Sequence, residues 1–92
     1  MKSSYLISYD IGNDNRLSKV FRYLKGKAIH LQYSVFYCFL NSKEILTIIK
    51  ELRGMINERE DDVRIYPLVD NFKFIVLGQG ARIPDGVDII LE

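Results

Sequence analysis

Two stripes of apolar residues at helical spacing alternate with strand-like runs along this chain, and that alternation limits the folds open to it. The stripes consist of Leu17, Val20, Phe21 and Leu24, and of Ile45, Ile48, Ile49, Leu52 and Ile56. β-Branched and aromatic residues gather in 5–11, 28–40 and 63–69, as is typical of strands. Because 28–40 is too long for one strand, we expect 32–34 to divide it. The order predicts an α+β fold, a ferredoxin-like β-α-β-β-α-β sandwich with two helices on one face of an antiparallel sheet.

The ends of both helices are also predicted by local residues. Asn13 or Asp14 can cap the first helix by accepting a backbone N–H, and Gly26 is expected to end it in a left-handed conformation. Asn41 can cap the second helix, and Glu44 follows three residues later, as in a capping box.

Length and composition restrict the class of protein. With 92 residues, the chain is expected to form a single domain over 1–92. Its net charge of +1 gives no global attraction to nucleic acid or membrane, so a polyanion site must come from local clustering of cations. The single Cys38 excludes an intrachain disulfide, and a lone thiol fits the reducing cytoplasm, where we expect the protein to be. No apolar run is long enough to span a bilayer, which predicts that no membrane is involved.

The predicted four-stranded sheet is complete without the C-terminal segment. This segment carries two further strand-like runs, 72–78 and 87–92, so we expect 72–92 to provide extra C-terminal strands that complete the sheet of a partner chain. Two helices cover only one sheet face, and the other face is expected to expose Phe36, Leu40 and their neighbours. These features predict a two-fold homodimer that forms through the uncovered faces.

The first strand ends on a carboxylate, Asp10. Because side chains alternate along a strand, Asp10 shares a face with Leu6 and Ser8, and Tyr9 lies on the other. If the odd-numbered residues pack under the helices, Asp10 lies on the dimer face and meets its own copy near the two-fold axis. Two carboxylates suit Mg²⁺, and that ion can activate water and polarise a phosphodiester. From the residues alone, the commoner role of an aspartate before a Gly-Asn turn is turn or cap formation.

Four short features then occur in a distinctive order: "YDI" at 9–11, Arg16 with Lys19, "QYSVF" at 32–36 and "VRIYPL" at 63–68. Over about residues 4 to 70, this arrangement closely resembles the small ferredoxin-like CRISPR-associated proteins that join the integrase in acquiring new spacers. Many members of that family have been described as metal-dependent endoribonucleases or endodeoxyribonucleases.

The resemblance implies a homodimer and a metal ion, Mg²⁺ with Mn²⁺ as the alternative, that the two protomers share at the aspartate that matches Asp10. Asp10 is therefore the candidate catalytic residue and metal ligand. The candidate nucleic-acid-binding residues are Arg16, Lys19 and Arg22, and the candidate supporting residues are Tyr9, Ser8 and Phe36. Charge on an exposed helix face, however, often serves solubility alone.

The implied function is CRISPR adaptation, with the integrase as partner, by a Mg²⁺-dependent endonuclease that cleaves phosphodiester bonds in RNA or duplex DNA. One alternative is a non-catalytic scaffold that bridges integrase dimers and protospacer DNA. The other is a ribonuclease toxin of similar fold.

Two more groups of side chains have two interpretations. Five tyrosines could stack on unpaired bases, although aromatic residues also favour strands for packing reasons. They are Tyr5, Tyr9, Tyr33, Tyr37 and Tyr66. The acidic run Glu58, Glu60, Asp61 and Asp62 could bind a cation, but we favour the simpler interpretation, a solvated, charge-rich turn between a helix and a strand.

Overall fold

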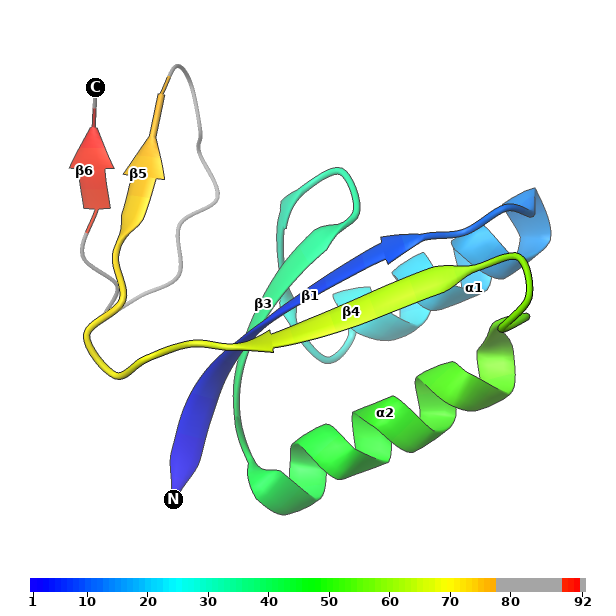
Figure 1. The fold of residues 1–92 in the computed structure, drawn as a ribbon, viewed down its shortest axis with the longest axis horizontal. Coiled ribbons are helices and arrows are strands. Elements are labelled where there is room, and N and C mark those ends of the chain that lie inside the picture. Colours follow the sequence, from blue (N-terminus) through cyan, green and yellow to red (C-terminus); the bar gives the residue numbers. More distant parts are fainter. Residues whose placement is uncertain (78–88, 92) are drawn as a thin grey trace.

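The computed structural model describes residues 1–77 and 89–91, and it has the predicted order of elements (Figure 1). They are β1 (Lys2–Asp10), α1 (Asp14–Lys25), β2 (Ile29–Gln32), β3 (Val35–Asn41), α2 (Ser42–Met55) and β4 (Asp62–Pro67). The four strands form one sheet in the order β2-β3-β1-β4, with every neighbouring pair antiparallel. The ferredoxin-like prediction is therefore confirmed. Neither helix is long and apolar enough to cross a bilayer over the described ranges.

The core lies between one face of this sheet and the two helices. Its buried residues come from β1, β3, α1 and α2, and those two helices contribute the stripes predicted from the sequence. They are Ile7, Tyr9, Val20, Leu24, Phe36, Cys38, Ile45, Ile48 and Leu52. Burial raises the pKa of the Cys38 thiol to about 11, so this group packs as a neutral side chain.

The register between β1 and β3 decides which residues face the core. Ile7 lies directly opposite Phe36, so even-numbered residues of β3 join odd-numbered residues of β1 beneath the helices. Phe36 is fully buried, and Leu40 packs against the core cluster. The prediction that these two residues lie on the uncovered face is therefore wrong. Asp10, in contrast, lies on the uncovered face, as predicted for the case in which Ile7 and Tyr9 pack under the helices.

The second helix begins as predicted. The Asn41 side chain accepts a hydrogen bond from the Glu44 backbone at 2.8 Å, and the Glu44 carboxylate accepts one from the Asn41 backbone at 3.0 Å. This reciprocal pair is a capping box, and it satisfies two backbone donors at once.

The first helix begins as predicted but ends differently. Asn13 Oδ1 accepts from the Arg16 backbone at 3.0 Å. Gly26 has φ −84°, so the predicted left-handed conformation is wrong. The helix ends instead by tightening, because the Gly26 N–H donates to the carbonyl of Tyr23, three residues back.

The run 28–40 is divided as predicted. A turn at Tyr33 and Ser34 separates β2 from β3, and the register shifts between His30 and Gln32. Tyr33 has φ +38°, and no other non-glycine residue among those described has a positive φ.

The C-terminal strands form a second sheet of two strands. β5 (Phe74–Val76) pairs in parallel with β6 (Ile89–Leu91), apart from the four-stranded sheet (Figure 1). Phe72 and Phe74 lie against Tyr37, with ring centroids 5.8 and 6.2 Å away, so this segment covers part of the open sheet face. The outer parts of the predicted strands, at 78, 87–88 and 92, lie outside the described residues. Exchange of these strands with a partner stays a prediction.

Candidate functional site

Asp10 is the last residue of β1, and its side chain is exposed on the open face of the sheet. In the register between β1 and β4 it lies directly opposite Asp62. Side chains of directly opposite residues point to the same face, with Cβ atoms about 5 Å apart. From the sequence, Asp62 is identified only as a member of an acidic run that could bind a cation, and not as a neighbour of Asp10. Its position at the start of a strand that pairs antiparallel with β1 is the signal that could have found it.

Arg64 partly balances this carboxylate pair. Its Nε donates to Asp62 Oδ2 at 3.0 Å, and both side chains are more than half exposed. Hydrogen bonds to Tyr66 and to Asp62 raise the pKa of Arg64. Arg64 in turn lies opposite Ser8, so Ser8 shares this end of the open face with Asp10. Two carboxylates and one guanidinium leave the cluster with a negative charge, and like charges directly opposite on a sheet repel.

The donor set fits a hard divalent cation. Mg²⁺ is usually bound through one or two carboxylates, with water and phosphate oxygens completing its coordination. Within 1–77 and 89–91, no three or more His, Cys, Asp or Glu side chains gather in a group that could hold a metal. One described chain therefore offers the pair Asp10 and Asp62.

Arg16 has a partner within the chain. Its Nε donates to Asp61 Oδ2 at 2.7 Å, and its Nη2 donates to Glu60 at 3.0 Å. The Asp61 side chain is fully buried and also accepts the backbone N–H groups of Gly12 at 2.9 Å and Asn57 at 2.8 Å. The interpretation of this acidic run as a wholly solvated turn is therefore wrong for Asp61.

This network, which we call the Asp61 clamp, ties the loop that follows Asp10 to the loop that precedes β4. The Arg16 side chain is 23% exposed. Its predicted contact with nucleic acid stays a prediction, and the observed hydrogen bonds give it a positioning role next to Asp10.

The clamp predicts a dependence of stability on pH. Hydrogen bonds from Arg16, and from the backbone of Asn57 and Gly12, hold the pKa of Asp61 well below its usual range. A carboxyl group with a lowered pKa in the folded state stabilises the fold above its unfolded pKa, and that contribution is lost as the pH falls. We expect wild-type stability to fall below about pH 4, and Asp61→Asn to be less stable at pH 7 and less sensitive to acid.

Thermal unfolding at pH 7 and pH 3 measures this effect. Glu58→Gln is the matched control, because the Glu58 carboxylate is 71% exposed and lies 3.8 Å from Arg53 in a surface ion pair. Exposed pairs of this kind contribute little to stability. Equal acid sensitivity of the wild type and Asp61→Asn would contradict the assignment.

The remaining predicted residues divide between the two sides of the sheet. Tyr9 faces the core and stacks on Phe36, with ring centroids 6.2 Å apart, so both support β1 from beneath rather than sharing the face of the Asp10 carboxylate. Lys19 and Arg22 are exposed on α1, which packs on the face opposite Asp10. The structure therefore brings Ser8 to the face of Asp10 and places the basic helix on the other side.

A comparison with known protein families identifies the family to which this chain belongs. A family model described as "CRISPR associated protein Cas2" matches residues 3–74. The chain belongs to the Cas2 family. The resemblance stated from the four sequence features is thereby confirmed.

Individual Cas2 proteins agree with that assignment. The chain is 51% identical over 89 residues to "CRISPR-associated endoribonuclease Cas2 2" of Thermodesulfovibrio yellowstonii, covering 97% of this chain and 98% of the relative. It is 35% identical over 82 residues to "CRISPR-associated endonuclease Cas2" of Halalkalibacterium halodurans, covering 84% and 85%. The crystal structure of Streptococcus pyogenes Cas2 at pH 6.5 superposes with a TM-score of 0.67 at 29% identity, covering 74% of this chain and 88% of that one. The ferredoxin-like architecture is thus shared with a solved Cas2.

Proposed function

We propose that this Cas2-family chain is a homodimeric, Mg²⁺-dependent endonuclease that cleaves phosphodiester bonds in RNA or duplex DNA during the acquisition of CRISPR spacers. The observation that carries the proposal is the exposed Asp10 carboxylate, directly across the sheet from Asp62 on the open face. The names of the relatives, which include both endoribonuclease and endonuclease, support the same reaction class.

The homodimer is supported by the apolar side chains that remain on the open face. Phe39 is 53% exposed, Tyr66 is 46% exposed and Ile29 is 45% exposed. The register of the sheet places all three on the face opposite the helices. Exposed apolar surface of this kind usually marks an interface, and a chain this short gains stability by burying it. A second copy on this face would bring the partner subunit's Asp10 toward the same axis.

Each residue of the site then has a definite task. Asp10 and Asp62, together with the partner subunit's Asp10, would hold one shared Mg²⁺, which when bound polarises the phosphodiester and makes water more acidic. Arg64 holds Asp62 through its guanidinium and keeps donors free for a phosphate oxygen, because its side chain is 64% exposed. The Asp61 clamp fixes the loop that follows Asp10.

The experiment is a cleavage assay on purified protein with end-labelled RNA and end-labelled duplex DNA, in Mg²⁺ and in EDTA. We expect cleavage of at least one substrate in Mg²⁺ and none in EDTA. Cleavage that persists in EDTA, or no cleavage of either substrate in Mg²⁺ or Mn²⁺, would contradict the proposal.

A specific observation also favours the scaffold function. Lys19 and Arg22 are exposed on a helix that packs on the sheet face opposite Asp10. Duplex DNA bound along this helix would use phosphate contacts and would not need the carboxylates. In that case Lys19→Ala with Arg22→Ala weakens duplex binding in the presence of the integrase, whereas Asp10→Asn does not. Membership of the Cas2 family argues against the ribonuclease-toxin alternative.

A further inference from the structure

A pocket of about 450 Å³ lies between α1 and the β2–β3 hairpin, on the sheet face opposite Asp10. Its lining residues are Tyr9, Leu17, Ser18, Phe21, Tyr33 and Ser34. Its volume is within the range of sites that bind small molecules. Three aromatic residues and two serines in the lining favour a flat ligand with a polar edge.

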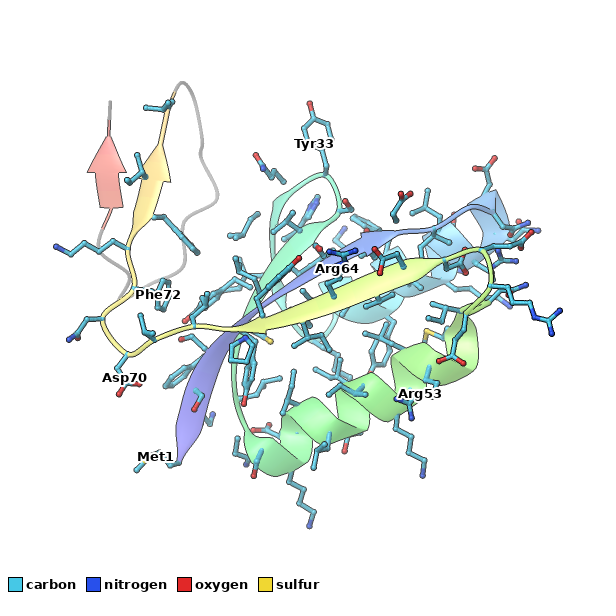
Figure 2. All side chains as sticks on the ribbon, in the orientation of Figure 1. Met1, Tyr33, Arg53, Arg64, Asp70 and Phe72 are labelled. Atoms are coloured by element: carbon cyan, nitrogen blue, oxygen red, sulfur yellow. The ribbon has the colours of Figure 1, made fainter. Side chains whose placement is uncertain are left out.

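Tyr33 is the unusual member of this lining. It projects from the tip of the hairpin (Figure 2), and it is 90% exposed. Its φ of +38° is unfavourable for a bulky residue, and glycine would adopt the same conformation without strain. An exposed side chain at a strained position makes no contribution to the core. Such strain is often found at functional sites.

The backbone of the turn is held from both sides. The Tyr33 carbonyl accepts a hydrogen bond from His30 Nε2 at 2.6 Å, and the Ser34 carbonyl accepts one from the Tyr9 backbone at 3.2 Å. The His30 ring stacks on the buried Phe36, with centroids 4.8 Å apart. The Tyr33 side chain is therefore presented by a fixed support and not by a free loop.

Positive charge borders the pocket on the helix side. Arg22 Nε donates to the carbonyl of the lining residue Ser18 at 3.4 Å. Lys25 Nζ lies 5.9 Å from the centre of the ring of the lining residue Phe21. A ligand with an aromatic ring and an attached phosphate would match both the lining and this border.

We propose that this pocket binds an unpaired nucleobase of single-stranded nucleic acid, stacked on Tyr33, with the adjoining phosphates at Arg22 and Lys25. The serine hydroxyls, which both donate and accept hydrogen bonds, face the polar edge of the base. A paired base inside a duplex cannot enter, so the site selects single strands, overhangs or frayed ends. This inference rests on the proposed function only in that the protein handles nucleic acid, and it does not require cleavage.

The test measures binding in EDTA, where no cleavage is expected. Single-stranded DNA and RNA that carry 2-aminopurine are titrated with the protein, and a blunt duplex serves as the reference. We expect the 2-aminopurine fluorescence to be quenched on binding, as stacking on a ring predicts. Tyr33→Ala is expected to weaken single-strand affinity about ten-fold and to leave duplex affinity unchanged. Tyr33→Phe keeps the ring and should bind like the wild type.

Two more variants separate stacking from a structural effect. Tyr33→Gly removes the ring and the strain together, so we expect an unfolding temperature at or above that of the wild type, with the same loss of single-strand affinity. Leu46→Ala removes another exposed apolar side chain, 63% exposed on α2, and should change neither affinity.

Several results would overturn the inference. Wild-type single-strand affinity in Tyr33→Ala, or an unquenched 2-aminopurine signal, would exclude the stacked base. A change in dimer mass on Tyr33→Ala would assign the pocket to a second copy of the chain. Duplex binding without single-strand binding contradicts this inference alone, whereas single-strand binding without any Mg²⁺-dependent cleavage contradicts the proposed function alone.

Discussion

Asp10→Asn is expected to reduce Mg²⁺-dependent cleavage about 100-fold or more, while the unfolding temperature stays close to that of the wild type. The substitution keeps the size of an exposed side chain and removes the charge that would hold the metal. Loss of metal activation costs several kcal/mol of transition-state stabilisation, and each tenfold in rate corresponds to about 1.4 kcal/mol. Stability should not fall, because the change removes the repulsion between Asp10 and the opposite Asp62. Initial cleavage rates and thermal unfolding measure the two effects on one preparation.

Asp14→Asn is the matched control for this variant. Asp14 is an exposed aspartate in the first turn of α1, four residues along the chain, and it lies outside the carboxylate pair. Its substitution should leave the cleavage rate within about two-fold of the wild type. Cleavage that survives Asp10→Asn, or that falls equally with Asp14→Asn, would remove Asp10 from the catalytic role.

Phe36→Ala is expected to lower the free energy of unfolding by about 3–5 kcal/mol, a large part of the total stability of a domain of this size. The reason is burial, because Phe36 is fully inaccessible and its ring lies 4.8–6.2 Å from the rings of His30, Phe21 and Tyr9. Removing it leaves a cavity at the centre of the packing between the sheet and α1. Urea unfolding, monitored by tyrosine fluorescence, measures the change.

A phenylalanine-to-alanine substitution on the opposite face of β3 is the matched control. Phe39 is 53% exposed on the open face, so Phe39→Ala should lower the unfolding free energy of a single chain by less than about 1 kcal/mol. Its effect should appear instead in the dissociation of the proposed dimer. If Phe39→Ala proved more destabilising than Phe36→Ala at low protein concentration, the assignment of the two faces would be reversed.

Local features of the sequence were sufficient to predict the elements of the fold. The apolar stripes and the capping box at Asn41 depend on residues three or four positions apart, so they can be read without the tertiary structure. The face occupied by Phe36 could not be read in this way. It depends on the register between β1 and β3, and a shift of one residue would exchange the two faces.

The candidate site, like the fold, could be predicted from local sequence only in part. Asp10 could be selected from its own position at the end of a strand. Its neighbour Asp62 and the Asp61 clamp are 52 and 51 residues away in the chain (62 − 10 and 61 − 10), and they become visible only when β4 pairs with β1. The strained turn at Tyr33 carries no glycine or asparagine that would have indicated a positive φ.

We propose that two chains share one metal ion, bound by their Asp10 carboxylates across a two-fold axis. The most direct test is a calorimetric titration with Mn²⁺, combined with sedimentation analysis of the same sample. We expect one Mn²⁺ for every two chains, bound to a species of twice the 10.7 kDa mass of one chain, and no such binding in Asp10→Asn. One Mn²⁺ per chain, or binding by a species of 10.7 kDa, would contradict it.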